Sequence, residues 1–275
     1  MELPRFTEHQ EHDKLLPLEH PVPPEAFVRD WLSGLRAGRD PGSIRVLDLG
    51  CGRGGTVAWL LEQGWDAYGM DVDARYLANG RHYLDAHGHP DRLQELGGDR
   101  YPYADASFDV VLSDQVLEHV RDLPALAVEV ARVTRPGGLG LHVFPARWRV
   151  TESHLGIPFA HWLPKGPARR AALGLALRAG LAAPYFADHP LPDRVDIYAT
   201  YSEDETFYRS PEVLTGTFEG AGLAVDLSRL SRRRVQHALR GRLPGPLVPA
   251  AGLAYRTSMS VYLGTTRRRL PEPPG

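Results

Sequence analysis

Short apolar runs alternate with helix-like patterns through the first half of the chain. Apolar stretches of a few residues predict buried strands, and apolar residues recurring every three or four positions predict amphipathic helices. The predicted strands are 44–49, 67–70, 93–96, 108–113 and 139–144. The predicted helices are 24–36, 56–63, 73–86 and 122–134. This alternation predicts an α/β fold in which parallel strands are joined by right-handed crossovers.

The alternation stops between Pro145 and Tyr201 and then resumes. The interrupting stretch is rich in aromatic residues and has an Ala- and Leu-rich pattern that predicts a helix over 168–183, so it is more than a loop. The elements predicted after it are a helix over 210–220, strands at 223–227 and 258–263, and a basic connector over 232–242. We therefore expect an N-terminal arm and helix (1–43), a core (44–144), a cap insertion (145–201) and a C-terminal part of the core sheet (202–275).

Composition and charge exclude several classes of protein. The 275 residues carry a net charge of −2, so the chain lacks the broad positive surface that nucleic-acid binding requires. The single cysteine, Cys51, excludes an internal disulfide framework and a cysteine-based zinc site. No apolar run approaches the roughly 18 residues of a membrane span, and no apolar signal core is present. We therefore expect a cytoplasmic protein without membrane contact.

A glycine-rich turn follows the first predicted strand. Residues 46–55 read V-L-D-L-G-C-G-R-G-G, with glycines at 50, 52 and 55 in G-x-G-x-x-G spacing. Glycines at these positions allow a ligand to approach the backbone and the chain to turn tightly into a helix. Asp71 follows Gly50 by 21 residues, where a carboxylate can accept both hydroxyls of an adenosine ribose. NAD and S-adenosylmethionine fit these features equally well.

Asp48 separates the two cofactors. It is an ionisable residue in an apolar strand, two positions before the first glycine of the turn. A buried carboxylate is costly without a partner. The pyrophosphate of NAD is anionic and is disfavoured beside it, whereas a sulfonium that carries an α-amino group is cationic and is favoured. Asp48 therefore favours S-adenosylmethionine.

An ordered set of motifs resembles class I S-adenosylmethionine-dependent methyltransferases. The segments that carry the resemblance are Asp48–Gly54 (their D-x-G-x-G-x-G motif), Gly69–Asp71, Gly98–Asp99, Ser107–Ser113, Val116–His119 and Arg132–Gly138. The resemblance covers about residues 44–144. It implies a Rossmann-like seven-stranded methyltransferase sheet with helices on both faces, here with a helical cap insertion. It also implies S-adenosylmethionine as cofactor and S-adenosylhomocysteine as product.

The resemblance implies a cofactor role for ten residues. They are Asp48, Gly50, Cys51, Gly52, Asp71, Val72, Asp99, Arg100, Ser113 and Gln115. The residues of the glycine turn would border the methionyl part, with Cys51 as a small turn residue rather than a nucleophile. Ser113 and Gln115, just past the fourth strand, would line the methionyl end and the mouth of the substrate site.

The adenosine part would lie at the end of the second and third strands. The resemblance implies that Asp71 binds the ribose hydroxyls and that Met70 or Val72 packs on the adenine. Asp99 would meet the adenine amino group, and Arg100 follows it in the same loop.

Three histidines are candidates for catalysis. Methyl transfer is an in-line displacement that depends mainly on alignment, and a general base helps if the acceptor is a hydroxyl or a protonated amine. The candidate bases are His119, His154 and His161, and the alternative for each is a structural histidine. The last two lie in T-E-S-H-L-G-I-P-F-A-H-W-L-P, residues 151–164, which resembles a segment of a bacterial subgroup of these methyltransferases. A metal site of His154, His161 and Glu152 does not match a tight ligand motif, so we predict no metal.

Aromatic residues of the insertion are candidates for the substrate pocket. Trp148, Phe159, Trp162 and Tyr185 either wall an apolar or sugar-binding pocket or form a satellite core. The fourth strand is not followed by the N-P-P-Y signature of enzymes that methylate bases.

The hypothesis is methyl transfer to an O or N atom, less readily a C atom, of a small molecule such as a natural product or sugar-like metabolite. A non-catalytic cofactor-binding module and an NAD-linked oxidoreductase are the alternatives. A homodimer is left open.

Overall fold

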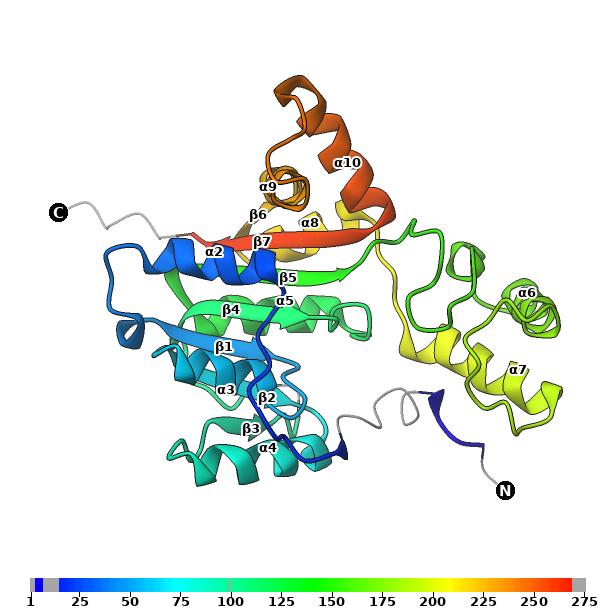
Figure 1. Ribbon diagram of the computed structural model, residues 1–275, viewed down its shortest axis with the longest axis horizontal. Coiled ribbons are helices and arrows are strands. Elements are labelled where there is room, and N and C mark those ends of the chain that lie inside the picture. The colour runs from blue at the N-terminus through cyan, green and yellow to red at the C-terminus, as the bar shows by residue number, and fades with distance from the viewer. Residues whose placement is uncertain (1–2, 7–14, 99, 269–275) are drawn as a thin grey trace.

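The computed structural model describes residues 3–6, 15–98 and 100–268, and it contains a seven-stranded sheet with helices on both faces (Figure 1). The strand order is β3-β2-β1-β4-β5-β7-β6. The strands are β1 (Arg45–Leu49), β2 (Asp66–Asp71), β3 (Leu93–Glu95), β4 (Phe108–Asp114), β5 (Thr134–Pro145), β6 (Leu223–Asp226) and β7 (Ser260–Arg267). The first five pair in parallel, and β7 is antiparallel to both β5 and β6. The predicted sheet is confirmed.

Helices cover the two faces because successive strand residues point in opposite directions. The helices are α2 (Ala26–Arg36), α3 (Gly55–Glu62), α4 (Ala74–Ala86), α5 (Leu123–Val133), α6 (Pro167–Arg178), α7 (Leu191–Thr200), α8 (Pro211–Gly220), α9 (Ser228–Ala238) and α10 (Val248–Ser258). On one face Val46 packs in a core with residues of α2, α3, α4 and α9. On the other face its neighbour Leu47 packs in a core with residues of α5 and α8.

The start of several helices follows from local sequence. The Asp73 carboxylate accepts a hydrogen bond from the backbone N–H of Arg75 at the start of α4. The Asp122 carboxylate does the same for Ala125 in α5, so each caps a helix N-terminus whose N–H groups lack partners within the helix. These caps place the first turns of both helices next to the carboxyl ends of β2 and β4.

The inserted stretch builds a small core of its own. Leu173 and Leu177 of α6 pack against Ile197 and Tyr198 of α7. Phe6, which belongs to the N-terminal arm, is buried in the same cluster. Figure 1 shows α6 and α7 set apart from the sheet, on the side where the carboxyl ends of β4 and β5 lie. The cap insertion is thus held to the N-terminal arm through an apolar contact.

The structure corrects several predicted elements. Residues 135–138, which separate the predicted helix 122–134 from the predicted strand 139–144, lie inside β5, where an irregularity in the pairing with β4 accommodates Pro136 and the positive φ of Gly137. The predicted helix over 168–183 ends at Arg178, and α7 was not predicted.

The connector predicted over 232–242 is largely helical, because α9 runs to Ala238. It buries Leu230 and Val235 and exposes the other arginines of α9, whereas Arg234 is partly buried and donates to the Tyr262 hydroxyl. The helix α10 after it was also not predicted. Among the described helices, none has the length and apolar character needed to cross a membrane.

Candidate active site

A cavity of about 700 Å³ lies at the carboxyl ends of β1, β2 and β4. Ligands of parallel α/β sheets bind at this edge, where loops after several strands converge. Five of the predicted site residues line the cavity: Gly50, Asp71, Val72, Gln115 and His119. The rest of the wall comes from Leu49 and Met70, the start of α4, the segment after β3, the loop after β4 and the first turn of α5. Asp204, Glu205 and Phe207, which follow the cap, and Arg5 of the N-terminal arm complete it.

Gly50 forms the tight turn that leads from the end of β1 into the cavity wall. Its backbone has a φ of +73°, and its N–H donates to the carbonyl of Met70 at 2.8 Å. A Cβ added at Gly50 would lie 2.4 Å from Cγ2 of Val116, in the loop that follows β4. Only glycine therefore lets these two loops meet, and the backbone itself forms the floor of the cavity at this point.

Asp71 is held rigidly at the end of β2. Its carboxylate accepts hydrogen bonds from the backbone N–H of Gly52 at 2.7 Å and from that of Asp73 at 3.0 Å. Val72 beside it is 71% exposed and leaves an apolar surface on the cavity wall. A fixed acceptor next to an apolar surface suits a ribose attached to a flat aromatic base.

Asp48 lies in β1, directly before the cavity-lining Leu49 and Gly50. Its side chain is buried, and no described residue donates a hydrogen bond or forms an ion pair with its carboxylate. Burial, with a smaller contribution from the nearby carboxylates of Asp114 and Asp71, raises the pKa of Asp48 to about 8. An anionic ligand group would raise it further, whereas a cationic group would stabilise the carboxylate. The residues therefore fit a sulfonium or ammonium and not a pyrophosphate.

Two of the predicted catalytic histidines lie against each other, and one of them, His119, lines this cavity. The rings of His119 and His154 are 5.0 Å apart, and the Nε2 atom of each lies 4.0 Å from the buried carboxylate of Glu118. Nδ1 of His119 is 2.9 Å from the carbonyl oxygen of Glu205. A carbonyl can only accept, so Nδ1 carries a proton and Nε2 of neutral His119 has the lone pair.

The comparisons with known proteins agree with this geometry. Residues 47–141 match a family described as "Methyltransferase domain". Over 151 residues the chain is 30% identical to a ubiquinone biosynthesis O-methyltransferase from Rhizobium rhizogenes, a match that covers 51% of this chain and 60% of the relative. Over 101 residues it is 41% identical to an uncharacterized methyltransferase from Mycobacterium sp., covering 37% of this chain and 38% of that one. The core is a class I S-adenosylmethionine-dependent methyltransferase domain.

The similarity in fold covers more of the chain than the similarity in sequence. An S-adenosylmethionine-dependent methyltransferase from Mesorhizobium loti superimposes with a TM-score of 0.53 at 19% identity, over 88% of this chain and 98% of that one. The chain spans 60% of the length of the Rhizobium relative. The family match ends at residue 141, before the cap begins. The methyltransferase core is shared with the relatives, and the cap has to be interpreted from its own residues.

Five described residues of the predicted cofactor set lie outside the cavity lining: Asp48, Cys51, Gly52, Arg100 and Ser113. The Ser113 hydroxyl is buried and lies 2.8 Å from Nδ1 of His142 on β5. The Arg100 side chain is 74% exposed and extends toward the carboxylate of Asp105 at 3.4 Å. Asp99, also predicted, lies outside the described residues. Position along the chain could not predict which way the side chains of Ser113 and Arg100 turn.

Cys51 is a packing residue of the turn. Its Sγ lies so close to β2 that a Cβ added at Gly69 would be 2.7 Å from it. Burial raises the pKa of the thiol well above its usual range, which keeps it protonated and unreactive. This placement agrees with a small turn residue rather than a nucleophile.

The aromatic residues of the cap divide into two groups, and neither lines the cavity. Trp162 lies between Trp148 and Phe159, with ring centroids 5.8 and 4.9 Å apart, and all three are at least 39% exposed. Tyr185 instead packs edge-on against Phe6 at 5.5 Å, in the apolar core of the cap. The satellite-core alternative therefore describes Tyr185.

The third predicted catalytic histidine, His161, is separate from the other two. It is 6% exposed, and its ring lies 4.8 Å from that of Tyr208. Burial lowers the pKa of His161, so it remains neutral at physiological pH. This environment is that of a histidine that packs the base of the cap.

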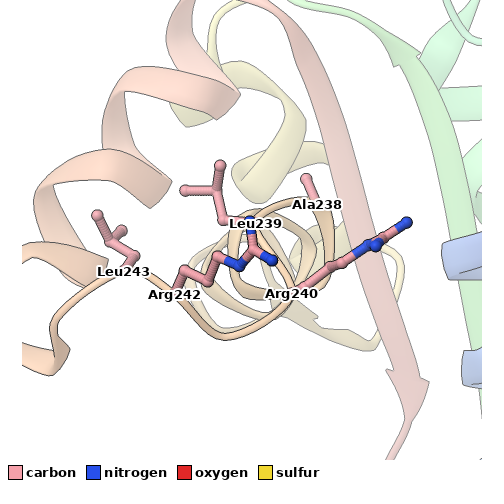
Figure 2. Close-up of a pocket in the computed structure, with 5 residues that line it drawn as sticks. All are labelled: Ala238, Leu239, Arg240, Arg242 and Leu243. Atoms are coloured by element: carbon pink, nitrogen blue, oxygen red, sulfur yellow. The ribbon is translucent and has the colours of Figure 1, made fainter.

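A second hollow of about 390 Å³ lies after the end of α9, and Figure 2 shows the residues around it. They are Ala238, Leu239, Arg240, Arg242 and Leu243. This wall has no carboxylate or histidine, and no cavity-lining residue of the methyltransferase core belongs to it. The cavity at the strand ends is therefore the candidate active site.

Proposed function

We propose that the chain is an S-adenosylmethionine-dependent methyltransferase that transfers a methyl group to an oxygen or nitrogen atom of a small molecule. The buried Asp48 carboxylate carries this proposal, because it lies beside the glycine turn and lacks a cationic partner among the described residues. A cavity of about 700 Å³ lies in the size range of small-molecule sites, about 300–1,000 Å³.

The residues of the core would hold the two ends of the cofactor. Asp71 would accept the ribose hydroxyls, and the exposed side chain of Val72 would cover one face of the adenine. Asp48 would balance the positive charge at the methionyl end, close to Gly50. When bound, the cofactor supplies an electrophilic methyl group on a sulfonium whose sulfur leaves as a thioether.

His119 is the best placed of the three candidate histidines to accept a proton from the acceptor. It lines the cavity, and its Nδ1–H is anchored on the carbonyl of Glu205, which leaves Nε2 as the basic nitrogen. General-base catalysis of this kind contributes roughly 10²- to 10⁴-fold. The acceptor would enter between the core and the segment that follows the cap, where Glu205 and Phe207 line the wall.

Binding measurements distinguish the cofactor alternatives. Calorimetry with S-adenosylmethionine, S-adenosylhomocysteine and NAD is expected to give binding of the first two only. Asp48→Asn should weaken binding of S-adenosylmethionine, and Arg100→Ala, whose side chain extends toward Asp105, should leave it unchanged. Binding of NAD alone would overturn the proposal in favour of an oxidoreductase.

Turnover measurements distinguish an enzyme from a binding module. Formation of S-adenosylhomocysteine is followed while the chain is offered quinols, phenols, sugars and amines. A catalyst forms product with at least one class of acceptor, and His119→Ala lowers kcat more than KM. A chain that binds the cofactor yet forms no product with any class would be the non-catalytic module.

A further inference from the structure

A mixed cluster of two histidines and a carboxylate lies where the core meets the cap. Glu118 and His119 follow β4, and His154 comes from the insertion, 35 residues further along the chain. One ligand atom from each lies within 4.8 Å of the other two. The side chain of Glu118 is 1% exposed, that of His154 is 17% exposed and that of His119 is 31% exposed. Glu118 is thus shielded from solvent, whereas His119 is partly exposed and lines the cavity.

The geometry points to a divalent metal site of the zinc type formed by Glu118, His119 and His154. This inference rests on the proposed methyltransferase function and deepens it, because it adds a cation at the acceptor end of the same cavity. Two imidazoles and one carboxylate form a donor set that zinc accepts in catalytic sites, with a fourth position left for an exogenous ligand. Calcium and magnesium prefer sets made of oxygen alone.

The distances favour a tetrahedral cation. With metal–ligand bonds of about 2.0–2.1 Å, tetrahedral ligand atoms lie about 3.4 Å apart, and neighbouring octahedral ones about 3.0 Å apart. The two Nε2–Oε1 distances are 4.0 Å. To bind a tetrahedral ion, each of these two Nε2–Oε1 distances must shorten by about 0.6 Å, which small side-chain rotations supply. An octahedral ion would require about 1 Å.

Neighbouring groups orient one ring and fix the backbone of another ligand. The carbonyl of Glu205 accepts from Nδ1 of His119 and so directs the Nε2 lone pair of that ring toward Glu118. Metal-binding histidines are normally oriented in this way by a hydrogen bond from the ring nitrogen that is not coordinated. The backbone N–H of His154 donates to the carboxylate of Glu152 at 2.8 Å, and the Tyr208 hydroxyl donates to that same carboxylate, which fixes the backbone that carries the second imidazole.

The position of the cluster also indicates what the cation would do. His119 lines the cavity, so the fourth coordination position would face the acceptor. An acceptor hydroxyl at that position would be oriented and would release its proton to solvent more readily, since a bound cation lowers the pKa of a coordinated oxygen. Nε2 of His119 would then be a ligand, so the cation would take over the activating role that His119 has as a base in the metal-free site. The inferred substrate class is therefore a small molecule that carries a hydroxyl.

The test uses the full chain, freed of metal by a chelator and titrated with Zn²⁺ by calorimetry. One Zn²⁺ per chain is expected, and His154→Ala and Glu118→Gln should each weaken its binding at least tenfold. His189→Ala is the matched control, because His189 forms another histidine–carboxylate pair in the cap, with Asp188 at 3.1 Å. This control should bind Zn²⁺ like the wild type. Titration with Co²⁺ should add the visible absorption of a tetrahedral ion, which the two cluster variants lose.

Two results would overturn the metal site. One is the absence of stoichiometric Zn²⁺ binding, and the other is equal binding by the wild type and both cluster variants, which indicates adventitious surface binding. Affinity for S-adenosylhomocysteine, measured on the same samples, shows that each variant has a folded core. If that ligand binds and Zn²⁺ does not, only the metal site fails, whereas a wild type that binds neither S-adenosylhomocysteine nor S-adenosylmethionine defeats the proposed function itself.

Discussion

Replacing Asp48 by Asn should flatten the dependence of stability on pH. The pKa of Asp48 is about 8 in the folded protein, compared with 3.8 for an exposed aspartate. The folded state therefore keeps a proton that the unfolded chain releases, so stability falls as the pH rises above about 4 and levels off above about 8. Between pH 5 and pH 9 the loss attributable to this one group is about 4 kcal/mol.

The measurement is urea unfolding followed by circular dichroism at pH 5, 7 and 9, without cofactor. The Asn variant has nearly the same shape but no charge, so between pH 5 and pH 9 it should lose about 4 kcal/mol less than the wild type. Asp85→Asn, at an exposed position of α4, is the control and should follow the wild-type curve. Parallel curves for Asp48→Asn and the wild type would refute the idea that this carboxylate is buried without a cation.

The same proton should be linked to cofactor binding. A cationic ligand stabilises the carboxylate, so its binding displaces the proton from Asp48 when the pH is below about 8. The affinity for S-adenosylmethionine should therefore rise between pH 6 and pH 8, approaching tenfold per pH unit, and the rise should be absent in Asp48→Asn. Calorimetry at several pH values measures this slope, and a flat profile in the wild type would exclude the linkage.

Three further substitutions test the cavity and the cap. Asp71→Ala should weaken S-adenosylhomocysteine binding by about 1–3 kcal/mol in calorimetry, and unchanged affinity would show the ribose assignment to be wrong. Gly50→Ala should destabilise the protein by about 1–3 kcal/mol more in urea unfolding than Gly88→Ala, because both have positive φ but only the first forces a Cβ against Val116. Phe6→Ala, expected to cost about 3–5 kcal/mol locally, should speed hydrogen exchange in α6 and α7 but not in β1 and β4; unchanged cap protection would contradict that role.

Elements with strong local signals were predicted well. The strands β1 and β4 are buried on both faces, so their sequences are mostly apolar and are recognisable without knowledge of the neighbours. The helices α4 and α5 begin at Asp73 and Asp122, whose side chains cap the first turn from within a few residues. In contrast, α7, α9 and α10 bury few residues each, and their stability depends on packing that a local pattern does not contain.

More of the residues predicted for the cofactor than of those predicted for the acceptor line the cavity. Gly50 and Asp71 follow adjacent parallel strands, and such strand ends meet at one edge of a sheet whatever the rest of the chain does. Ser113 and Arg100 show the limit of that rule, because strand position does not decide whether a side chain turns to the cavity, to His142 or to Asp105.

The sequence alone determined the sheet, the glycine turn and the charge preference of Asp48, because each depends on residues close together or on the fixed geometry of parallel strands. Tertiary structure decided which histidines meet. It brought His154 to Glu118 and His119 and left His161 against Tyr208, although the two cap histidines are seven residues apart in the same motif. It also placed Arg5 in the cavity wall and Phe6 in the cap core. Contacts between segments so far apart depend on how the cap packs against the core, and no local pattern encodes that packing.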